Sequence, residues 1–324
     1  MRSSVWPRCN VSASNYDDAA PYNGGHPRGL QCCSQATIRR CLIFHPEPIE
    51  IGPAMYLPEF LNLGAGFAKY FEVLPATSEN LRQSVFRIRH AVYCDELGYE
   101  PTRPDGMESD SFDQHAVHCL LRNAHSRESV GCVRLILAQP NDPRSLLPFE
   151  RLCDASLERT IVDPARLDRT RIAEVSRLAV VSRYRRRRGE QKVALGISEG
   201  DFGTPDRPRF PYIAAGLYLG MIAQARHHGV DTLFMLTERR LTKQLARLGV
   251  TLRLIGAPVQ HRGTRYPSMM SVDEVIDGLS FFVRPLFAVI AGQMEAAYAS
   301  AVRSPAPQAE GASGFTPTSL DSPS

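Results

Sequence analysis

The sequence is poor in the residues and spacings that mark several protein classes. It has one tryptophan in 324 residues, and none of its eight cysteines forms a C-x-x-C pair. Paired spacings of that kind are typical of zinc sites and thiol redox sites, so we expect no metal site and no disulfide framework. The first residues also lack the apolar segment of a secretory signal. We therefore expect a cytoplasmic protein.

Long apolar runs and a strong excess of one charge are missing too. The most apolar late stretch, residues 281–302, contains Arg284 and Glu295, which argues against a membrane span. The net charge of +4 is too small for a polycation that binds nucleic acid along its whole surface. Basic residues gather instead at 183–188, where Tyr184 is the one aromatic residue. This local run favours a specific anionic ligand or partner over nucleic acid.

Composition divides the chain into four parts. Residues 1–66 are predicted to form a poorly ordered extension, with translation from Met55 as an alternative. Residues 67–280 carry alternating and helical apolar patterns, which predict one α/β domain with a mixed sheet. Residues 281–303 are predicted to be helical, and the tail at 304–324, rich in Ser, Pro and Ala, is predicted to be disordered.

One stretch joins a buried strand to a basic turn. Residues 173–182 are mostly apolar, and residues 183–189 read Arg-Tyr-Arg-Arg-Arg-Arg-Gly. Continuous apolar runs are typical of strands buried on both faces, and a glycine turn lets backbone amides approach a phosphate. Glu174 and Arg177 are three residues apart, so a regular strand would place their side chains on opposite faces.

An acidic segment precedes two adjacent apolar strands. Glu108, Asp110 and Asp113 lie within six residues, and their charges repel one another unless cations or substrate lie between them. In the second strand, residues 130–137, Arg134 interrupts the apolar pattern. A buried guanidinium is costly without a carboxylate partner, so we expect Arg134 to pair with the acidic segment.

Two helices carry residues of interest. The first is predicted to run from about residue 77 to 93, and it places Arg89 and Tyr93 one turn apart near its end. The second carries Gly216 and Gly220 four residues apart. These glycines are small enough to let the helix approach a sheet closely.

Several motifs combine in order along residues 70–278. They are Arg89-His90-Ala91-Val92-Tyr93, Tyr99, Glu108-x-Asp110-x-x-Asp113, Val133-Arg134-Leu135, Phe149, Glu174-Val175-Ser176-Arg177, Tyr184-Arg185-Arg186-Arg187 and His261-Arg262-Gly263-Thr264-Arg265-Tyr266-Pro267. The first six of these motifs resemble the acyl-homoserine lactone synthases. With the last two, the set is more similar still to the N-acyl amino acid synthases associated with the PEP-CTERM/exosortase system. The resemblance implies a single GNAT-like (acyl-CoA N-acyltransferase) α/β domain with a mixed, mostly antiparallel central sheet flanked by helices.

The resemblance also implies an activity. It is the transfer of a long-chain fatty acyl group from a thioester of acyl carrier protein, or of CoA, to the amine of an amino acid or similar small molecule. The implied cosubstrate is acyl-phosphopantetheine or acyl-CoA, with no tightly bound cofactor. Acyl carrier protein is the implied macromolecular partner.

Roles for individual residues follow from the motifs and from the chemistry. Glu108 is the expected base, because the attacking amine must lose a proton. The other expected catalytic residues are Asp110, Asp113, Arg134 and Glu174; for Asp110 and Arg134, a buried ion-pair network is the alternative. Expected substrate-binding residues are Arg89, Tyr93, Tyr99, Phe149, Arg177, His261 and Arg265. Residues expected to hold pantetheine or its phosphate are Leu178, Ala179, Val180, Arg186, Arg187, Arg188 and Gly189.

Two features depart from the family pattern. Tyr93 and Tyr99 stand where the lactone synthases usually have phenylalanine and tryptophan at the S-adenosylmethionine pocket, and residues 190–211 form an insertion after the basic turn. Three alternatives therefore stay open. They are a homoserine lactone synthase that uses S-adenosylmethionine, a catalytically silent acyl- or carrier-binding module, and nucleic-acid binding through the arginine run.

Overall fold

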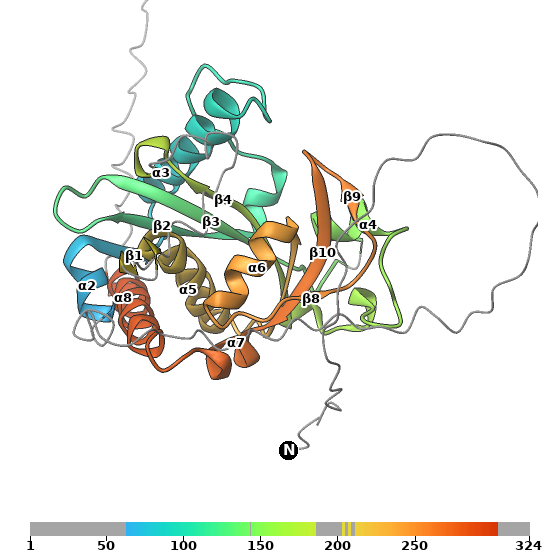
Figure 1. Ribbon diagram of the computed structural model, residues 1–324. Coiled ribbons are helices and arrows are strands. Elements are labelled where there is room, and N and C mark those ends of the chain that lie inside the picture. Colours follow the sequence, from blue (N-terminus) through green and yellow to red (C-terminus); the bar gives the residue numbers. More distant parts are fainter. Residues whose placement is uncertain (1–62, 143, 186–202, 205–206, 209–210, 304–324) are drawn as a thin grey trace, which may run out of the picture. The chain divides into compact units, whose positions relative to one another are not determined.

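A computed structural model describes residues 63–142, 144–185, 203–204, 207–208 and 211–303 (Figure 1). The chain divides into two units after residue 41, and every described residue belongs to the second unit, Leu42–Ser324. The predicted extension at 1–66 therefore falls almost wholly outside the described residues, as does the predicted tail at 304–324.

An eight-stranded sheet forms the centre of the described part. Its strand order is β1-β2-β3-β4-β7-β10-β8, and β9 pairs with β10. Neighbouring strands are antiparallel except β4 and β7, which are parallel, so the predicted mixed, mostly antiparallel sheet is confirmed. The strands are β1 Phe71–Pro75, β2 Ala116–Asn123, β3 Ser129–Leu137, β4 Ile172–Val180, β7 Thr232–Thr237, β8 Arg253–Leu254, β9 Val259–Gln260 and β10 Thr264–Ser271, with a separate two-stranded pair of β5 Gly203–Thr204 and β6 Arg207–Pro208.

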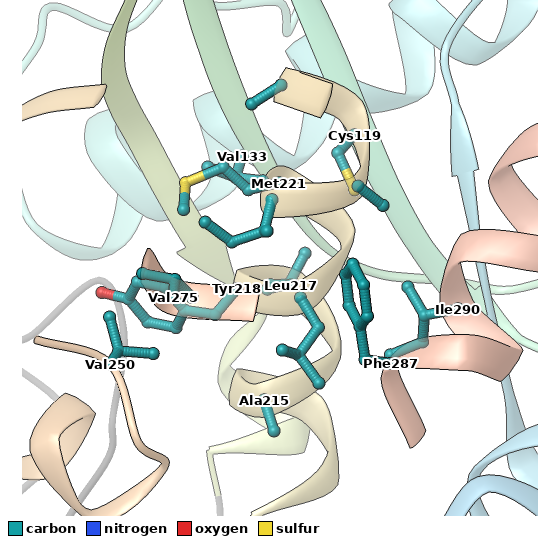
Figure 2. Packing of buried hydrophobic residues seen from close by; sticks show 14 of the residues in the cluster. Cys119, Val133, Ala215, Leu217, Tyr218, Met221, Val250, Val275, Phe287 and Ile290 are labelled. Carbon is teal, nitrogen blue, oxygen red and sulfur yellow. The ribbon is translucent and has the colours of Figure 1, made fainter. Parts of the chain in front are cut away.

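Helices flank the sheet on both faces. On one face α5 packs against α8 and the sheet, and Figure 2 shows Leu217 and Met221 of α5 among side chains such as Phe287 of α8. On the other face α3 and α4 cover separate apolar clusters. None of the described helices combines the length and the apolar character that a membrane crossing needs. The helices are α2 Leu63–Tyr70, α3 Glu79–Arg89, α4 Pro148–Cys153, α5 Tyr212–His227, α6 Arg239–Arg247, α7 Val272–Gly278 and α8 Arg284–Arg303.

Local sequence explains how α3 begins and which side it buries. The Ser78 hydroxyl accepts a hydrogen bond from the Leu81 N–H at 3.4 Å, as expected for an N-cap serine. Val85 and Ile88 are buried in the cluster that α3 forms with the sheet. The helix continues directly into a π-helical turn, His90–Glu96, which re-aims the residues that follow. The end of α3 is thereby fixed beside β3 and β4.

The two glycines of α5 permit the close approach that their spacing predicts. A Cβ atom on Gly216 would lie 2.7 Å from the Phe67 ring, and one on Gly220 would lie 2.5 Å from Val73 Cγ1 and 2.9 Å from Cys119 Sγ. Carbon atoms are not found at such separations, so α5 reaches the sheet because these side chains are absent.

We expect Gly220→Ala to lower the free energy of unfolding by about 1–3 kcal/mol, because the added methyl overpacks the contact with β1 and β2. Gly292→Ala in α8 is the matched control, since an added Cβ there meets nothing within 4 Å. In this control, replacement of the helical glycine by alanine should raise the free energy of unfolding by about 0.5–1 kcal/mol. Urea denaturation of both variants measures the difference, and equal stability would show that α5 does not need the glycine.

Strand β10 is poorly marked in the sequence, where the residues between 256 and 271 resemble a loop. The structure has an eight-residue strand there, and α7 follows it with Ser271 as its N-cap. Polar residues and Pro267 hide the alternation that marks strands. The ladder to β7 and the hydrogen bond from Ile255 N–H to the Pro267 carbonyl, 2.9 Å, hold this segment in the sheet.

Candidate active site

Strand β4 carries a bulge at Arg177. Its register with β3 shifts between Cys132 and Arg134, and Arg177 has a left-handed backbone with φ of 53°. One extra residue therefore lies in β4, which changes the alternation of side chains beyond it. The expectation that Glu174 and Arg177 point to opposite faces is wrong for this reason. Both lie on the face covered by α3 and α4.

The two halves of β4 differ on the side toward β7. Parallel pairing with β7 covers residues 172–175 and then stops. Residues 176, 179 and 180 pair with β3 only, among the residues described. The Val181 N–H donates to the Val130 carbonyl of β3 at 3.0 Å, so alternation along the strand directs the Val180 N–H to the open side. The predicted pantetheine contacts, Leu178, Ala179 and Val180, lie on this half.

A buried ion-pair network lies beside the bulge. Arg89 donates to Glu108 at 2.5 Å and to Asp113 at 2.7 Å. Arg134 pairs with Asp110 at 2.7 Å and with Asp113 at 2.8 Å, which confirms that it pairs with the acidic segment. The Arg134 Nε–H also donates to the Ser176 hydroxyl at 3.0 Å. Helix α3, the acidic segment, β3 and β4 thus meet at one point.

The same network has a partly exposed rim. Arg177 Nη2 pairs with Glu108 at 3.0 Å, with Asp110 at 3.3 Å and with Glu100 at 2.9 Å. Arg262 pairs with the same Glu100 oxygen. The side chains of Arg89 and Arg134 are 0% and 2% exposed, whereas those of Glu100 and Arg262 are 21% and 25% exposed. A small molecule can therefore reach the rim but not the buried pairs.

The carboxylates of the network differ in pKa. Burial opposes ionisation of Glu108, but hydrogen bonds from Arg89 and Arg177 outweigh it and lower the pKa of Glu108 to about 2. Burial also opposes ionisation of Asp113, yet Arg89 and Arg134 hold the pKa of Asp113 well below its usual range. Both groups stay ionised at neutral pH, and both are held by arginines.

Glu174 has the opposite behaviour. It is buried, and the Phe149 N–H of α4 donates to it at 2.7 Å. Burial raises the pKa of Glu174 to about 8, and the hydrogen bond from Phe149 offsets this effect only in part. The environment of Glu174 therefore favours the protonated form, whereas that of Glu108 favours the ionised form.

Two of the aromatic residues predicted at the site, Tyr93 and Phe149, pack against its strands. The Tyr93 hydroxyl donates to the Leu178 carbonyl at 2.9 Å, and the Arg177 guanidinium lies 5.4 Å from the Tyr93 ring centre. Phe149 stacks on Phe234 of β7 at 4.4 Å and is fully buried. Tyr93 therefore contacts β4 and Phe149 contacts β7, near the point where the pairing of these two strands stops.

The loop between β9 and β10 brings a further set of groups to the rim. His261 is half-buried, and burial together with Arg262 and Arg265 lowers its pKa. Arg265 pairs with Glu238 and donates to the carbonyls of His261 and Arg262 at 3.3 and 3.1 Å. The Arg265 side chain thus holds the loop together and links it to the residue before α6.

Some residues predicted at the site cannot be placed, and some residues of the site were not predicted. Arg186, Arg187, Arg188 and Gly189 lie outside the described residues. Glu100, Ser176 and Arg262 belong to the site but were given no role from the sequence, although Ser176 and Arg262 stand within two of its motifs. Glu100 follows Tyr99 directly and Arg262 follows His261, so adjacency to selected residues was the available signal. In the part of the chain that the structure describes, no group of three or more His, Cys, Asp or Glu side chains is arranged to hold a metal ion.

The region from the end of α3 through β4 decides the class of domain. Residues 88–194 match the family model of the acetyltransferase (GNAT) domain. The chain therefore carries a GNAT-type domain, an enzyme domain of the acyltransferase class, and the predicted GNAT-like fold is confirmed. No protein with a curated description matches the sequence.

Three solved structures are similar to parts of this chain. A CoA-dependent acyl-homoserine lactone synthase, MesI, is 22% identical over 67% of this chain and 94% of its own, with a TM-score of 0.43. A second CoA-dependent synthase of this kind, BjaI, is 18% identical over 69% of this chain and 89% of its own, with a TM-score of 0.45. FeeM, an N-acyl amino acid synthase from uncultured soil microbes, is 16% identical over 64% of this chain and 94% of its own, with a TM-score of 0.41. None of these distant likenesses assigns a substrate to this chain.

Proposed function

We propose that the chain is an N-acyltransferase that moves a long fatty acyl group from a thioester to the amine of an amino acid or similar small molecule. The observation that carries this proposal is the position of the charged rim. It lies at the bulge of β4, beside the half of the strand that, among the described residues, has no pairing partner on the β7 side. An extended thioester arm can pair with that free edge, and an amine can approach it from the rim.

The reaction forms one bond and breaks one. The amine nitrogen attacks the thioester carbonyl carbon to form a C–N bond, and the C–S bond then breaks. One proton leaves the nitrogen and one proton is taken up by the departing thiolate, so the products are an amide and a free thiol. Backbone N–H groups at the open side of β4, including that of Val180, are placed to stabilise the negative charge on the carbonyl oxygen.

Glu174, rather than Glu108, is the base in this proposal. A base must accept a proton from an ammonium or amine near neutral pH, and a carboxylate with a pKa of about 2 does so poorly. Glu174 has a pKa of about 8 and lies on the same face as the rim. Because its side chain is buried, it takes the proton through water and not by direct contact with the amine. Glu108 then acts on Arg89 and Arg177, which it orients, instead of on the substrate.

The donor is the acyl thioester of acyl carrier protein or of CoA. The arginine run supports an anionic donor, although Arg183 and Arg185 already pair with Glu128 and Glu96. The roles of residues 186–189 at the phosphate stay predictions, and so does the specific relation to the PEP-CTERM/exosortase-associated synthases. The Arg183–Arg188 run would make binding of an acidic carrier protein sensitive to salt.

The test supplies the purified protein with palmitoyl-CoA or palmitoyl-acyl carrier protein and a mixture of amino acids. Thiol release and mass spectrometry of the products are expected to reveal N-acyl amino acids. Glu79→Gln neutralises an exposed carboxylate, and it is the control for the variants Glu174→Gln and Glu108→Gln. A lactone formed only with S-adenosylmethionine would establish the lactone synthase alternative. Binding of the acyl carrier protein without turnover would establish a silent module.

A further inference from the structure

His90 lies where α3 passes into its π-helical turn, and both nitrogens of its ring have a partner. The side chain is 10% exposed. Its Nε2 atom lies 3.0 Å from the backbone nitrogen of Arg103, and its Nδ1 atom lies 3.2 Å from a carboxylate oxygen of Asp95. A backbone N–H can only donate, so Nε2 accepts and the ring proton is on Nδ1, which donates to Asp95. These contacts define a neutral imidazole in one tautomer.

The π-helical turn, His90–Glu96, explains how Asp95 reaches the ring. Backbone hydrogen bonds in such a turn join residues five apart, as between the Leu97 N–H and the Val92 carbonyl at 3.1 Å. Asp95 is likewise the fifth residue after His90, so the turn brings its carboxylate beside Nδ1. In an uninterrupted α-helix, residues three or four apart are the ones that meet. The turn thus fixes the ring whose other nitrogen faces the loop that follows.

That loop, residues 97–110, is irregular, and Arg103 lies near its centre. Residues 101–105 are exposed, so apolar packing contributes little to their position. The Arg103 guanidinium donates to the Ser109 hydroxyl and carbonyl at 3.1 and 2.7 Å, which closes the loop on itself. The hydrogen bond from the Arg103 N–H to His90 then joins the centre of the loop to the end of α3.

The same loop carries two of the carboxylates that hold Arg177. Glu100 and Glu108 pair with Arg177 Nη2 at 2.9 and 3.0 Å. Arg177 has the left-handed backbone of the bulge, and such a backbone persists where its surroundings hold it. His90 therefore acts on the bulge through the loop.

We propose that His90 is a positioning residue for acyl transfer: its imidazole latches the 97–110 loop to the end of α3, and the loop keeps Glu100 and Glu108 on Arg177. The effect on turnover rests on the proposed function. In that proposal the amine approaches from the rim, whereas the thioester binds at the open half of β4. Release of the loop should therefore weaken the use of the acceptor and leave the use of the donor unchanged.

Three substitutions separate the latch from the bulk of the ring. The amide of a glutamine extends about as far as Nε2 and can accept from the Arg103 N–H, that of an asparagine extends only about as far as Nδ1, and leucine has no acceptor. Hydrogen exchange with mass spectrometry measures the protection of the amides of residues 97–110. In His90→Leu and His90→Asn this protection is expected to fall about 3- to 10-fold, as for the loss of one hydrogen bond. In His90→Gln it should stay close to that of the unaltered protein.

Kinetics supply the second measurement, with palmitoyl-CoA as donor and the acceptor that the amino-acid mixture identifies. In His90→Leu the KM for the acceptor is expected to rise about 3- to 10-fold, while the KM for palmitoyl-CoA does not change. His125→Leu is the matched control, because His125 is an exposed histidine in the turn between β2 and β3. Thermal denaturation of each variant checks that the fold is kept.

Unchanged protection of the loop in His90→Leu would overturn the proposal. A His90→Gln variant no better than His90→Asn would do the same, because the latch needs an acceptor at the position of Nε2. Equal increases in the two KM values would also overturn it, since they indicate a general loss of structure. Hydrogen exchange needs no substrate, so the absence of any acylated amine would contradict the proposed function while the protection of the loop still decides whether His90 is the latch.

Discussion

Glu174→Gln is expected to lower kcat/KM for acyl transfer by about 10²- to 10⁴-fold, the usual contribution of a positioned base. The substitution keeps the size of the side chain and removes the group that takes the proton. A buried glutamine can still accept the hydrogen bond from the Phe149 N–H, so α4 should stay in place. The loss should therefore appear in activity without unfolding.

The pH dependence separates this role from a structural one. With a pKa of about 8, Glu174 is ionised in roughly one molecule in ten at pH 7, so the rate should rise with pH up to about 8. The acceptor amine titrates as well. Measurements with two acceptors whose amine pKa values differ separate the titration of Glu174 from that of the amine. The part of the pH–rate profile due to Glu174 stays near pH 8, and the part due to the amine moves with the acceptor. In Glu174→Gln only the acceptor limb should remain.

Glu108→Gln gives the contrasting result. It removes the negative charge that Arg89 and Arg177 share and one of the two oxygens that accept their hydrogen bonds, so activity should fall together with stability, but the limb near pH 8 should persist. If the limb vanished in Glu108→Gln and survived in Glu174→Gln, the assignment of the base would be reversed.

The raised pKa of Glu174 also makes the free energy of unfolding decrease as pH rises. The folded pKa of Glu174 is raised above its ordinary value, so its favourable contribution is complete below about pH 4.5 and is lost as pH rises through about 8. Glu174→Gln removes this dependence. Urea denaturation at pH 6 and pH 9 should therefore show a smaller decrease for Glu174→Gln than for the unaltered protein.

Much of the architecture is visible in the sequence because it depends on local patterns. Apolar spacing places α3, and the two small residues of α5 indicate its close approach to the sheet. Arg134 within an apolar strand demands a carboxylate, and the acidic segment nearby supplies Asp110 and Asp113. In each case the signal and its consequence lie within one element or between neighbours in the sheet.

The remaining features depend on contacts that no local pattern encodes. Nothing around Arg177 signals a left-handed residue, because a bulge is more often marked by glycine. The order of the pKa values of Glu108 and Glu174 depends on which carboxylate receives guanidinium groups from elsewhere in the chain. Arg262 lies 162 residues from Glu100, so their pairing becomes visible only when the β9–β10 loop is placed.

Arg134→Leu is expected to lower the free energy of unfolding by about 3–5 kcal/mol at pH 7, because Asp110 and Asp113 lose the cation that they share. Arg82→Leu is the control. Arg82 is 47% exposed and pairs with Glu79, so its loss should cost less than about 1 kcal/mol. A cost for Arg134→Leu no larger than that of Arg82→Leu would contradict the buried network.

The sign of the pH effect follows from the depressed carboxylates. The pKa of Asp113 is held below its usual range partly by Arg134, so the stability from this pair is present above about pH 4 and is lost as pH falls further. The difference between Arg134→Leu and the unaltered protein should therefore shrink when urea denaturation is repeated at pH 3. Activity alone cannot make this distinction, because a broken network disturbs Arg89 and Glu108 as well. A penalty that persists unchanged at pH 3 would indicate that Arg134 acts through packing and not through its charge.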